Sequence, residues 1–145
     1  MDLLDRSGAG LTALVVDDDR SIRLMLCTVL DLEGWEVLEA GDGEMALLTA
    51  SARRPEAMIL DVMLPGRDGF GVLAELRQSH YGRNIAVVML TAKTQPSDVL
   101  RGTRLGADQY LTKPCDPDEV VDRLAFHALR RHPEARAERV PALRG

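Results

Sequence analysis

The stretch AMILDVMLPGRDG, residues 57–69, decides the fold. Its first four residues are apolar and typical of a buried strand, which ends at Asp61. Pro65, Gly66 and Gly69 then predict a turn. No residue next to Asp61 neutralises its carboxylate. A buried strand that ends on such an acid needs partners from elsewhere, so the ends of the other strands matter most.

Short apolar segments alternate with longer amphipathic segments along the chain. We expect strands at residues 13–16, 36–40, 57–60, 86–90 and 109–112. Helical spacing of apolar residues predicts helices around residues 22–30, 45–52, 70–76, from Ser97 or Asp98 to near Gly106, and 120–129. This alternation predicts an α/β fold, a doubly wound parallel sheet of five strands flanked by five helices.

Composition narrows the class of protein. The 145 residues, 46% hydrophobic and 28% charged, fit one globular domain. The net charge of -5 argues against a nucleic-acid binder, which needs a basic face. No apolar run approaches the roughly 20 residues that cross a bilayer, and the acidic N-terminus is unlike a signal peptide. Two cysteines, Cys27 and Cys115, are too few for a disulfide framework, so we expect a cytoplasmic protein.

Complementary polar residues follow four of the predicted strands. The carboxyl ends of parallel strands lie at one edge of a sheet, which is where ligands bind. The residues at these ends are Asp17, Asp18 and Asp19 after the first strand, Asp61 after the third, Thr91 after the fourth and Lys113 after the fifth. Two carboxylates about 4 Å apart repel by about 4 kcal/mol at an effective dielectric constant near 20. Such a cluster needs a cation, and hard oxygen ligands without His or Cys favour Mg²⁺.

Each of these residues also has a simpler interpretation. An acid after a strand is usually a solvated turn residue or a helix N-cap, and we favour that role for Asp19. A single Thr or Lys at a strand end carries little information. The combination of three acids, Thr91 and Lys113 at one edge favours a functional site that could accept a phosphoryl group.

At these residues the chain resembles the receiver domain of two-component response regulators. The matching motifs are LVVDDDRSIR (14–23), EAGDGEMAL (39–47), ILDVMLPGRDGFGVL (59–73), VVMLTA (87–92) and GADQYLTKP (106–114). The resemblance implies a flavodoxin-like sheet in the order 2-1-3-4-5. It also implies a receiver domain at residues 11–131, an N-terminal extension at 1–10 and a tail or linker at 132–145, with no second domain in this chain.

The resemblance implies a phosphoacceptor switch that catalyses only its own phosphorylation and dephosphorylation. Asp61 would accept a phosphoryl group from a histidine kinase or phosphotransfer protein. Asp18, Asp61 and the carbonyl of Met63 would bind Mg²⁺, with Asp17 acting largely through water. Lys113 would pair with the phosphoryl group, and a cis peptide bond is expected after it.

The resemblance also implies how the signal leaves the domain. Thr91 and Tyr110 would act as switch residues, and the changed surface would comprise the fourth helix, the fifth strand and the fifth helix. That surface would bind an unknown downstream effector, and it is where a homodimer would form. Ala92, Met63 and Lys93 would flank the pocket. We expect no membrane partner and no direct binding of nucleic acid by this chain.

Two other classes of protein deserve comparison. An aspartate-phosphorylating hydrolase also places an Asp after its first strand beside Mg²⁺, but it needs a DxD pattern with a downstream Thr or Val and often a cap domain. Here Arg20 and Ser21 follow the acids, no cap insertion is present, and the isolated Asp61 follows the third strand. A structural pseudo-receiver would normally have lost an acid or Lys113. Whether the chain is a stand-alone receiver or a piece of a longer regulator stays open.

Overall fold

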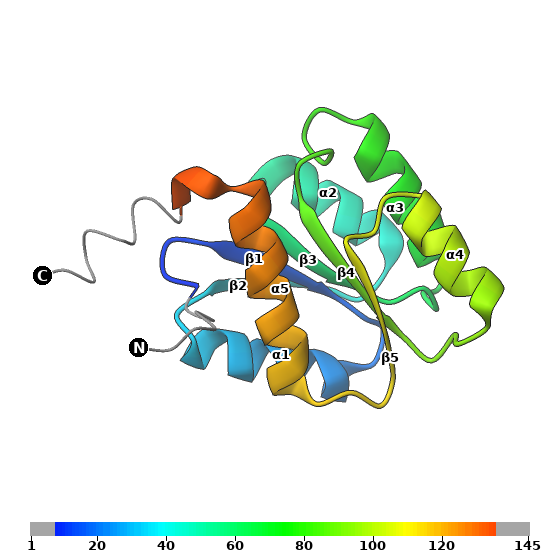
Figure 1. Ribbon diagram of the computed structural model, residues 1–145, viewed down its shortest axis with the longest axis horizontal. Coiled ribbons are helices and arrows are strands. Elements are labelled where there is room, and N and C mark those ends of the chain that lie inside the picture. The colour runs from blue at the N-terminus through cyan, green and yellow to red at the C-terminus, as the bar shows by residue number, and fades with distance from the viewer. Residues whose placement is uncertain (1–7, 136–145) are drawn as a thin grey trace, which may run out of the picture.

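The computed structural model describes residues 8–135 and confirms the predicted fold. Five parallel strands form one sheet in the order β2-β1-β3-β4-β5 (Figure 1). Their bounds lie within one residue of the predicted ones: β1 Thr12–Val16, β2 Glu36–Ala40, β3 Ala57–Leu60, β4 Ala86–Thr91 and β5 Gln109–Thr112. Most of the predicted N-terminal extension, 1–10, and tail, 132–145, lies outside the described residues.

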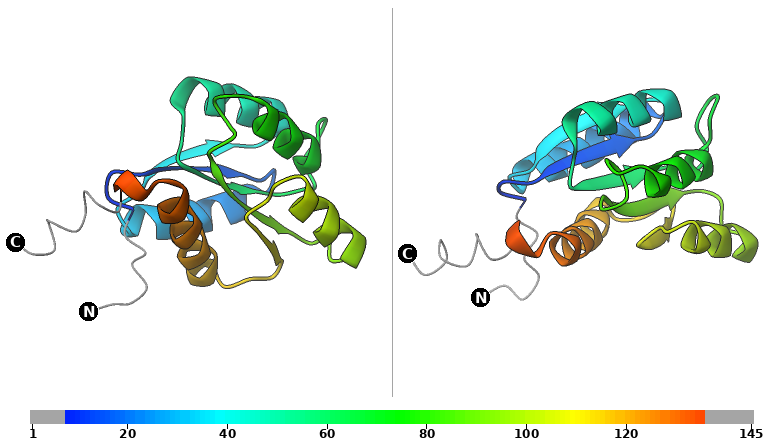
Figure 2. Two further views of the ribbon diagram at one scale, coloured as in Figure 1. Left: turned by 45° about the horizontal axis from the view of Figure 1, so that its top comes forward. Right: turned by 90° about the horizontal axis from the view of Figure 1, so that it is seen from above.

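Successive residues of the central strands face opposite sides of the sheet. Leu14, Met58 and Val87 pack in one core, whereas Val15, Ile59 and Val88 pack in the other. A strand covered on both faces by helices is apolar at every position, which is why β1, β3 and β4 read as continuous apolar runs. Figures 1 and 2 show helices on both faces of the sheet.

The helices are α1 (Arg20–Leu32), α2 (Gly43–Arg53), α3 (Gly69–Gln78), α4 (Pro96–Arg104) and α5 (Pro117–Arg131). Aspartate side chains cap all of them except α4. The prediction that Ser97 or Asp98 caps α4 is wrong. That helix begins at Pro96 because proline fixes φ at a helical value and lacks the N–H that a first turn leaves unpaired.

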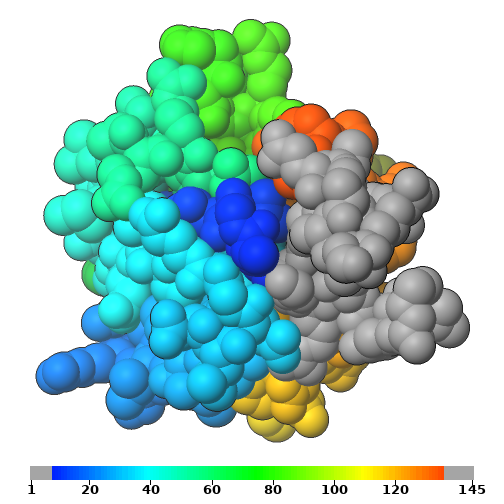
Figure 3. Space-filling model, turned by 90° about the vertical axis from the view of Figure 1, so that its left-hand side faces the viewer, coloured from blue at the N-terminus to red at the C-terminus, as the bar shows by residue number. Residues whose placement is uncertain are grey.

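The two cores divide the helices between the faces. Residues of α1 and α5 pack with Trp35 in one core, and residues of α2 and α3 fill the other. The start of the described chain lies at the amino-terminal end of the strands, where Gly8 donates a backbone hydrogen bond to Glu33 (2.8 Å). The first described residues are dark blue in Figure 3. Within residues 8–135, no helix is both long enough and apolar enough to cross a membrane.

Candidate functional site

The residues predicted to share one edge of the sheet do lie together. Asp17 and Asp61 are each 3% exposed, and Thr91 is fully buried. The backbone fixes their positions, because the amide of Asp61 donates to Val16 (3.0 Å) and the amide of Lys113 donates to Thr91 (2.8 Å). The strand ladder therefore continues past the strand ends and holds these side chains on a rigid frame.

Lys113 links the two buried acids. Its Nζ donates to Oδ2 of Asp17 at 2.8 Å and to Oδ2 of Asp61 at 2.7 Å. Burial alone would lower the pKa of Lys113, but its hydrogen bonds to both acids and their charges outweigh that effect and raise the pKa. Burial raises the pKa of Asp17, and its hydrogen bonds to Lys113 and to the Asp19 amide offset this only in part. The ammonium is therefore charged at neutral pH.

The three consecutive acids after β1 have different environments. Asp17 is buried, and its Oδ1 accepts a hydrogen bond from the Asp19 amide at 2.9 Å. Asp18 is exposed to solvent. Asp19 is the N-cap of α1, as predicted, and its Oδ1 accepts from the Ser21 amide at 2.9 Å. The sequence predicted the role of Asp19, but the residues alone could not separate the burial of Asp17 from the exposure of Asp18.

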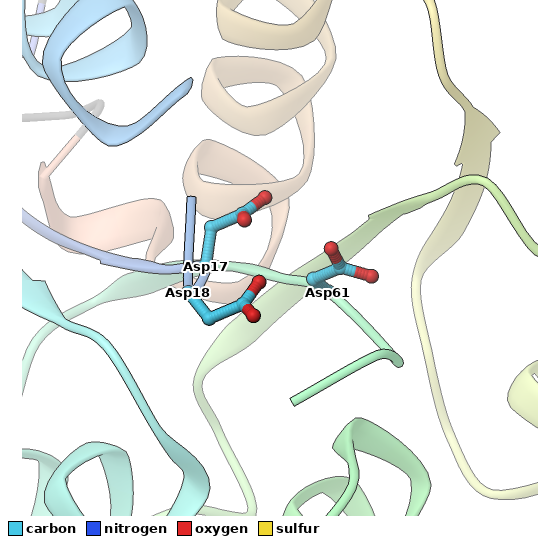
Figure 4. Close-up of side chains that lie close together, drawn as sticks. All are labelled: Asp17, Asp18 and Asp61. Atoms are coloured by element: carbon cyan, nitrogen blue, oxygen red, sulfur yellow. The ribbon is translucent and has the colours of Figure 1, made fainter. Parts of the chain in front are cut away.

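Asp17, Asp18 and Asp61 form a cluster that could hold a cation. One carboxylate oxygen from each lies within 4.8 Å of the others (Figure 4). These are hard anionic oxygens with no nitrogen or sulfur donor among them, the ligand set that Mg²⁺ prefers. With one Lys113 charge, three aspartates leave a formal charge of -2, which a divalent cation would balance. The residues present therefore fit Mg²⁺.

The predicted flanking residues follow Asp61 and Thr91 closely in the chain. The backbone amide of Met63 donates to Oδ1 of Asp61 at 2.9 Å, and the Met63 side chain is 54% exposed. Ala92 and Lys93, the two residues after Thr91, are exposed. The Thr91 hydroxyl accepts from the Lys93 amide at 3.3 Å, which leaves its own proton available for donation. A metal-ligating role for the Met63 carbonyl stays a prediction.

Tyr110 is half-buried on β5, and its hydroxyl donates to the backbone carbonyl of Lys93 at 2.8 Å. Burial, together with the charges of Asp98 and Asp61, raises the pKa of its phenol. The ring lies against Gly102 of α4, where a Cβ would stand 2.9 Å from Cδ2 of Tyr110. Gly102 is not among the residues predicted from the sequence, although a lone glycine inside a helical pattern is a recognised signal of close packing.

The comparisons with known proteins agree with this geometry. The family model described as the response regulator receiver domain matches residues 13–125. The chain belongs to the response regulator receiver family. The peptide bond between Lys113 and Pro114 is cis, as the resemblance to that family led us to expect.

Similar receivers occur in mycobacterial regulators and in solved structures. The probable transcriptional regulatory protein TcrX of Mycobacterium tuberculosis is 43% identical over 81% of this chain and 49% of its own length. The DNA-binding response regulator MtrA of Mycolicibacterium paratuberculosis is 44% identical over 86% of this chain and 54% of its own length. The structure of the chemotaxis response regulator CheY4 of Vibrio cholerae is 33% identical over 81% of this chain and 98% of that one, with a TM-score of 0.75.

These relatives correct one expectation about partners. The acidic net charge led us to exclude nucleic acid, yet MtrA is a DNA-binding response regulator. The receiver chain spans about half the length of the curated relatives it matches. Net charge describes only the surface of the residues counted. The net charge of a receiver chain therefore does not indicate whether a regulator about twice as long binds DNA.

Proposed function

We propose that this receiver accepts a phosphoryl group on Asp61 from a partner histidine kinase or phosphotransfer protein, in a reaction that depends on Mg²⁺. The observation that carries the proposal is the contact of Lys113 with Asp61 (2.7 Å) beside a cluster of three acids. A structural ion pair would need one acid only. A cluster of three acids with one ammonium leaves an excess of negative charge that suits a cation and a phosphoryl group together.

Asp61 would be the nucleophile. One of its carboxylate oxygens attacks the phosphorus of a phosphohistidine, a P–O bond forms, and the P–N bond breaks as the imidazole leaves with its electron pair. Asp17, Asp18 and Asp61 would hold Mg²⁺, which supplies positive charge to the phosphoryl oxygens when bound. Lys113 supplies a further charge there, because its pKa is raised and it stays protonated.

Phosphorylation of Asp61 would then alter the positions of Thr91 and Tyr110. The free proton of the Thr91 hydroxyl can be donated to a phosphoryl oxygen on Asp61. Tyr110 connects the segment after Thr91 to α4, through its hydrogen bond to Lys93 and its contact with Gly102. A shift of Thr91 would therefore alter the surface formed by α4, β5 and α5. Because relatives such as TcrX and MtrA are transcriptional or DNA-binding regulators, we propose control of transcription as the output.

A direct test is to incubate the protein with Mg²⁺ and acetyl phosphate and to measure its intact mass. Wild type should gain one phosphoryl group, and Asp61→Asn should gain none. Asp68→Asn is the matched control, because Asp68 caps α3 on the same loop and asparagine also caps helices well. Modification of the Asp61→Asn variant, or no modification of wild type, would contradict the proposal.

Other predictions from the sequence extend this proposal. Dephosphorylation at the same site, the domain limits at residues 11 and 131, and the cytoplasmic location remain predictions. A truncated protein of residues 11–131 that folds and accepts phosphate would support the proposed limits.

A further inference from the structure

Arg23 contacts the loop that carries the acids after β1. This residue lies in the first turns of α1, and its NH1 donates to the backbone carbonyl of Asp17 at 2.7 Å. Its Nε donates to Oε1 of Glu39 on β2 at 3.2 Å. The side chain is only 19% exposed, and a Cβ on Gly41 would lie 3.5 Å from NH1. The Arg23 side chain therefore connects α1 to the loop at Asp17 and to the end of β2.

These contacts fix the peptide between Asp17 and Asp18. The amide of Asp17 donates to Ala40 (3.2 Å), and its carbonyl accepts from Arg23. Both polar groups of the Asp17 backbone are thereby held, one by β2 and one by the guanidinium. The orientation of that peptide sets the direction in which the next side chain, Asp18, leaves the chain. Asp18 itself is exposed, and no hydrogen bond of its carboxylate holds it among the contacts of the described residues.

We propose that Arg23 is a positioning residue for the metal site, which holds the Asp17–Asp18 peptide so that both carboxylates face Asp61. This inference rests on the proposed function, because it concerns the same Mg²⁺ site. Arg23 would not touch the metal or the phosphoryl group. Its contribution is to supply a rigid loop before the cation arrives, as outer contacts of metal ligands do.

If only the charge of Arg23 mattered, the expected effect of its removal on Mg²⁺ affinity would have the opposite sign. A positive guanidinium close to a cation site repels the cation, so its removal should tighten Mg²⁺ binding if electrostatics dominates. Glu39 pairs with Arg23 and offsets much of that repulsion. Positioning therefore dominates, and removal of Arg23 weakens binding. The sign of the change separates the two explanations.

The experiment is a calorimetric titration of Mg²⁺ into the full chain, with wild type, Arg23→Met, Arg23→Lys and Arg53→Met. Outer contacts of metal ligands typically contribute 10–100-fold to affinity, and we expect Arg23→Met to bind about tenfold more weakly. Lysine keeps the charge but can make only one of the two contacts, so Arg23→Lys should be about threefold weaker. Arg53→Met is the control, because it also removes one arginine charge and one ion pair to β2, that of Arg53 with Glu36, but away from the acid cluster. This variant should bind Mg²⁺ with the affinity of wild type.

Unchanged or tighter binding by Arg23→Met would overturn the proposal, and so would an equal loss in Arg53→Met. Thermal unfolding without metal checks that each variant is folded. If Arg23→Met does not fold, Arg23→Lys decides: its charge is conserved, so affinity equal to wild type rules out positioning. The second readout is the rate of phosphorylation by acetyl phosphate against Mg²⁺ concentration. Arg23→Met should need about tenfold more Mg²⁺ for half the maximal rate and reach the wild-type rate at saturation.

The two proposals can fail separately. If wild type binds Mg²⁺ and is phosphorylated but Arg23→Met does both equally well, only the role of Arg23 is lost. If wild type binds Mg²⁺ and is never modified on Asp61, the phosphoacceptor function is lost while the affinities still test Arg23. If wild type does not bind Mg²⁺ at all, both proposals are wrong.

Discussion

The ammonium of Lys113 lies 2.7 Å from Oδ2 of Asp61, although β4 separates their two strands in the sheet. The lysine side chain spans the end of β4 and also reaches Asp17, the residue after β1 (2.8 Å). One cation thus serves two buried carboxylates from strands that do not neighbour its own. The stability of this end of the molecule should depend on that contact.

We expect Lys113→Met to lower the free energy of unfolding at pH 7, measured without metal, by about 1–3 kcal/mol. The substitution leaves Asp17 and Asp61 close together without their shared cation, while the methionine fills a similar volume. Lys93→Met, which removes an exposed lysine near the same edge, should change the free energy by no more than about 0.5 kcal/mol. Urea denaturation measures both variants.

The loss caused by Lys113→Met should depend on pH. The pKa of Lys113 is raised in the folded state, so, wherever its acidic partners are ionised, its stabilising effect is complete below 10.5 and disappears as pH rises through the folded value. The pKa of Asp17 is also raised, so ionisation of this acid opposes folding as pH rises above 3.8. Without Lys113, which lowers the pKa of Asp17, ionisation of Asp17 should oppose folding more strongly. The difference between the variant and wild type should therefore be small near pH 4 and larger at pH 7, and a constant difference would contradict this account.

Mg²⁺ should stabilise the folded protein through Asp18. At a concentration about ten times Kd, ligand binding stabilises by about 1.4 kcal/mol, which raises Tm by about 3–5 °C for a domain of this size. EDTA should abolish the increase. Asp18→Asn should lose most of it, because a neutral amide is a weaker ligand than a carboxylate.

Asp19→Asn is the matched control for Asp18→Asn. Asp19 lies next in the chain and is also exposed, but its carboxylate caps α1 and is not in the acid cluster. Asparagine caps helices as well as aspartate does, so this variant should keep the full Mg²⁺ response. An equal response in Asp18→Asn and Asp19→Asn would show that Asp18 is not a ligand.

Gly102→Ala should destabilise the protein although alanine is the better helix former by about 1 kcal/mol. Gly102 is the only buried residue of α4, and a Cβ there would stand 2.9 Å from Cδ2 of Tyr110 and 3.2 Å from Sδ of Met89. We expect a net loss of about 1 kcal/mol in the free energy of unfolding, since overpacking outweighs helix propensity. Urea denaturation gives the value.

Two further variants test that explanation. In a Tyr110→Leu background the ring is gone, so Gly102→Ala should cost less, and a double-mutant cycle measures the coupling. Gly71→Ala in α3 is the control, because a Cβ there would meet only the flexible side chain of Arg67 (3.1 Å) and the more distant Asp68. Greater stability of Gly102→Ala than of wild type would show that Tyr110 does not pack as described.

The strands and the set of acids could be predicted because they depend on local patterns. Apolar runs such as residues 57–60 have no other stable place than a covered sheet, and parallel strands end at one edge. The start of α4 could not be predicted as well, because Pro96 competes with Ser97 and Asp98 as a start signal. Arg23 gave no distinctive local signal, because its contacts are with the Asp17 loop and β2. Gly102 carried the signal of a glycine inside a helical pattern, but its partner, Tyr110, lies on another element and could not be named from the sequence.

The sequence by itself determined that acids, a threonine and a lysine follow successive strands, and hence that they meet. Only the tertiary structure decided which oxygen faces which group. Asp17 turns inward to a lysine 96 residues away, whereas Asp18 stays exposed, although the two are chemically identical neighbours. The reason is that the position of a carboxylate depends on the free energy of its burial and of its pairing with distant charges. Burial and pairing contribute to the free energy only in the folded protein, where the sheet brings the carboxylates and Lys113 together.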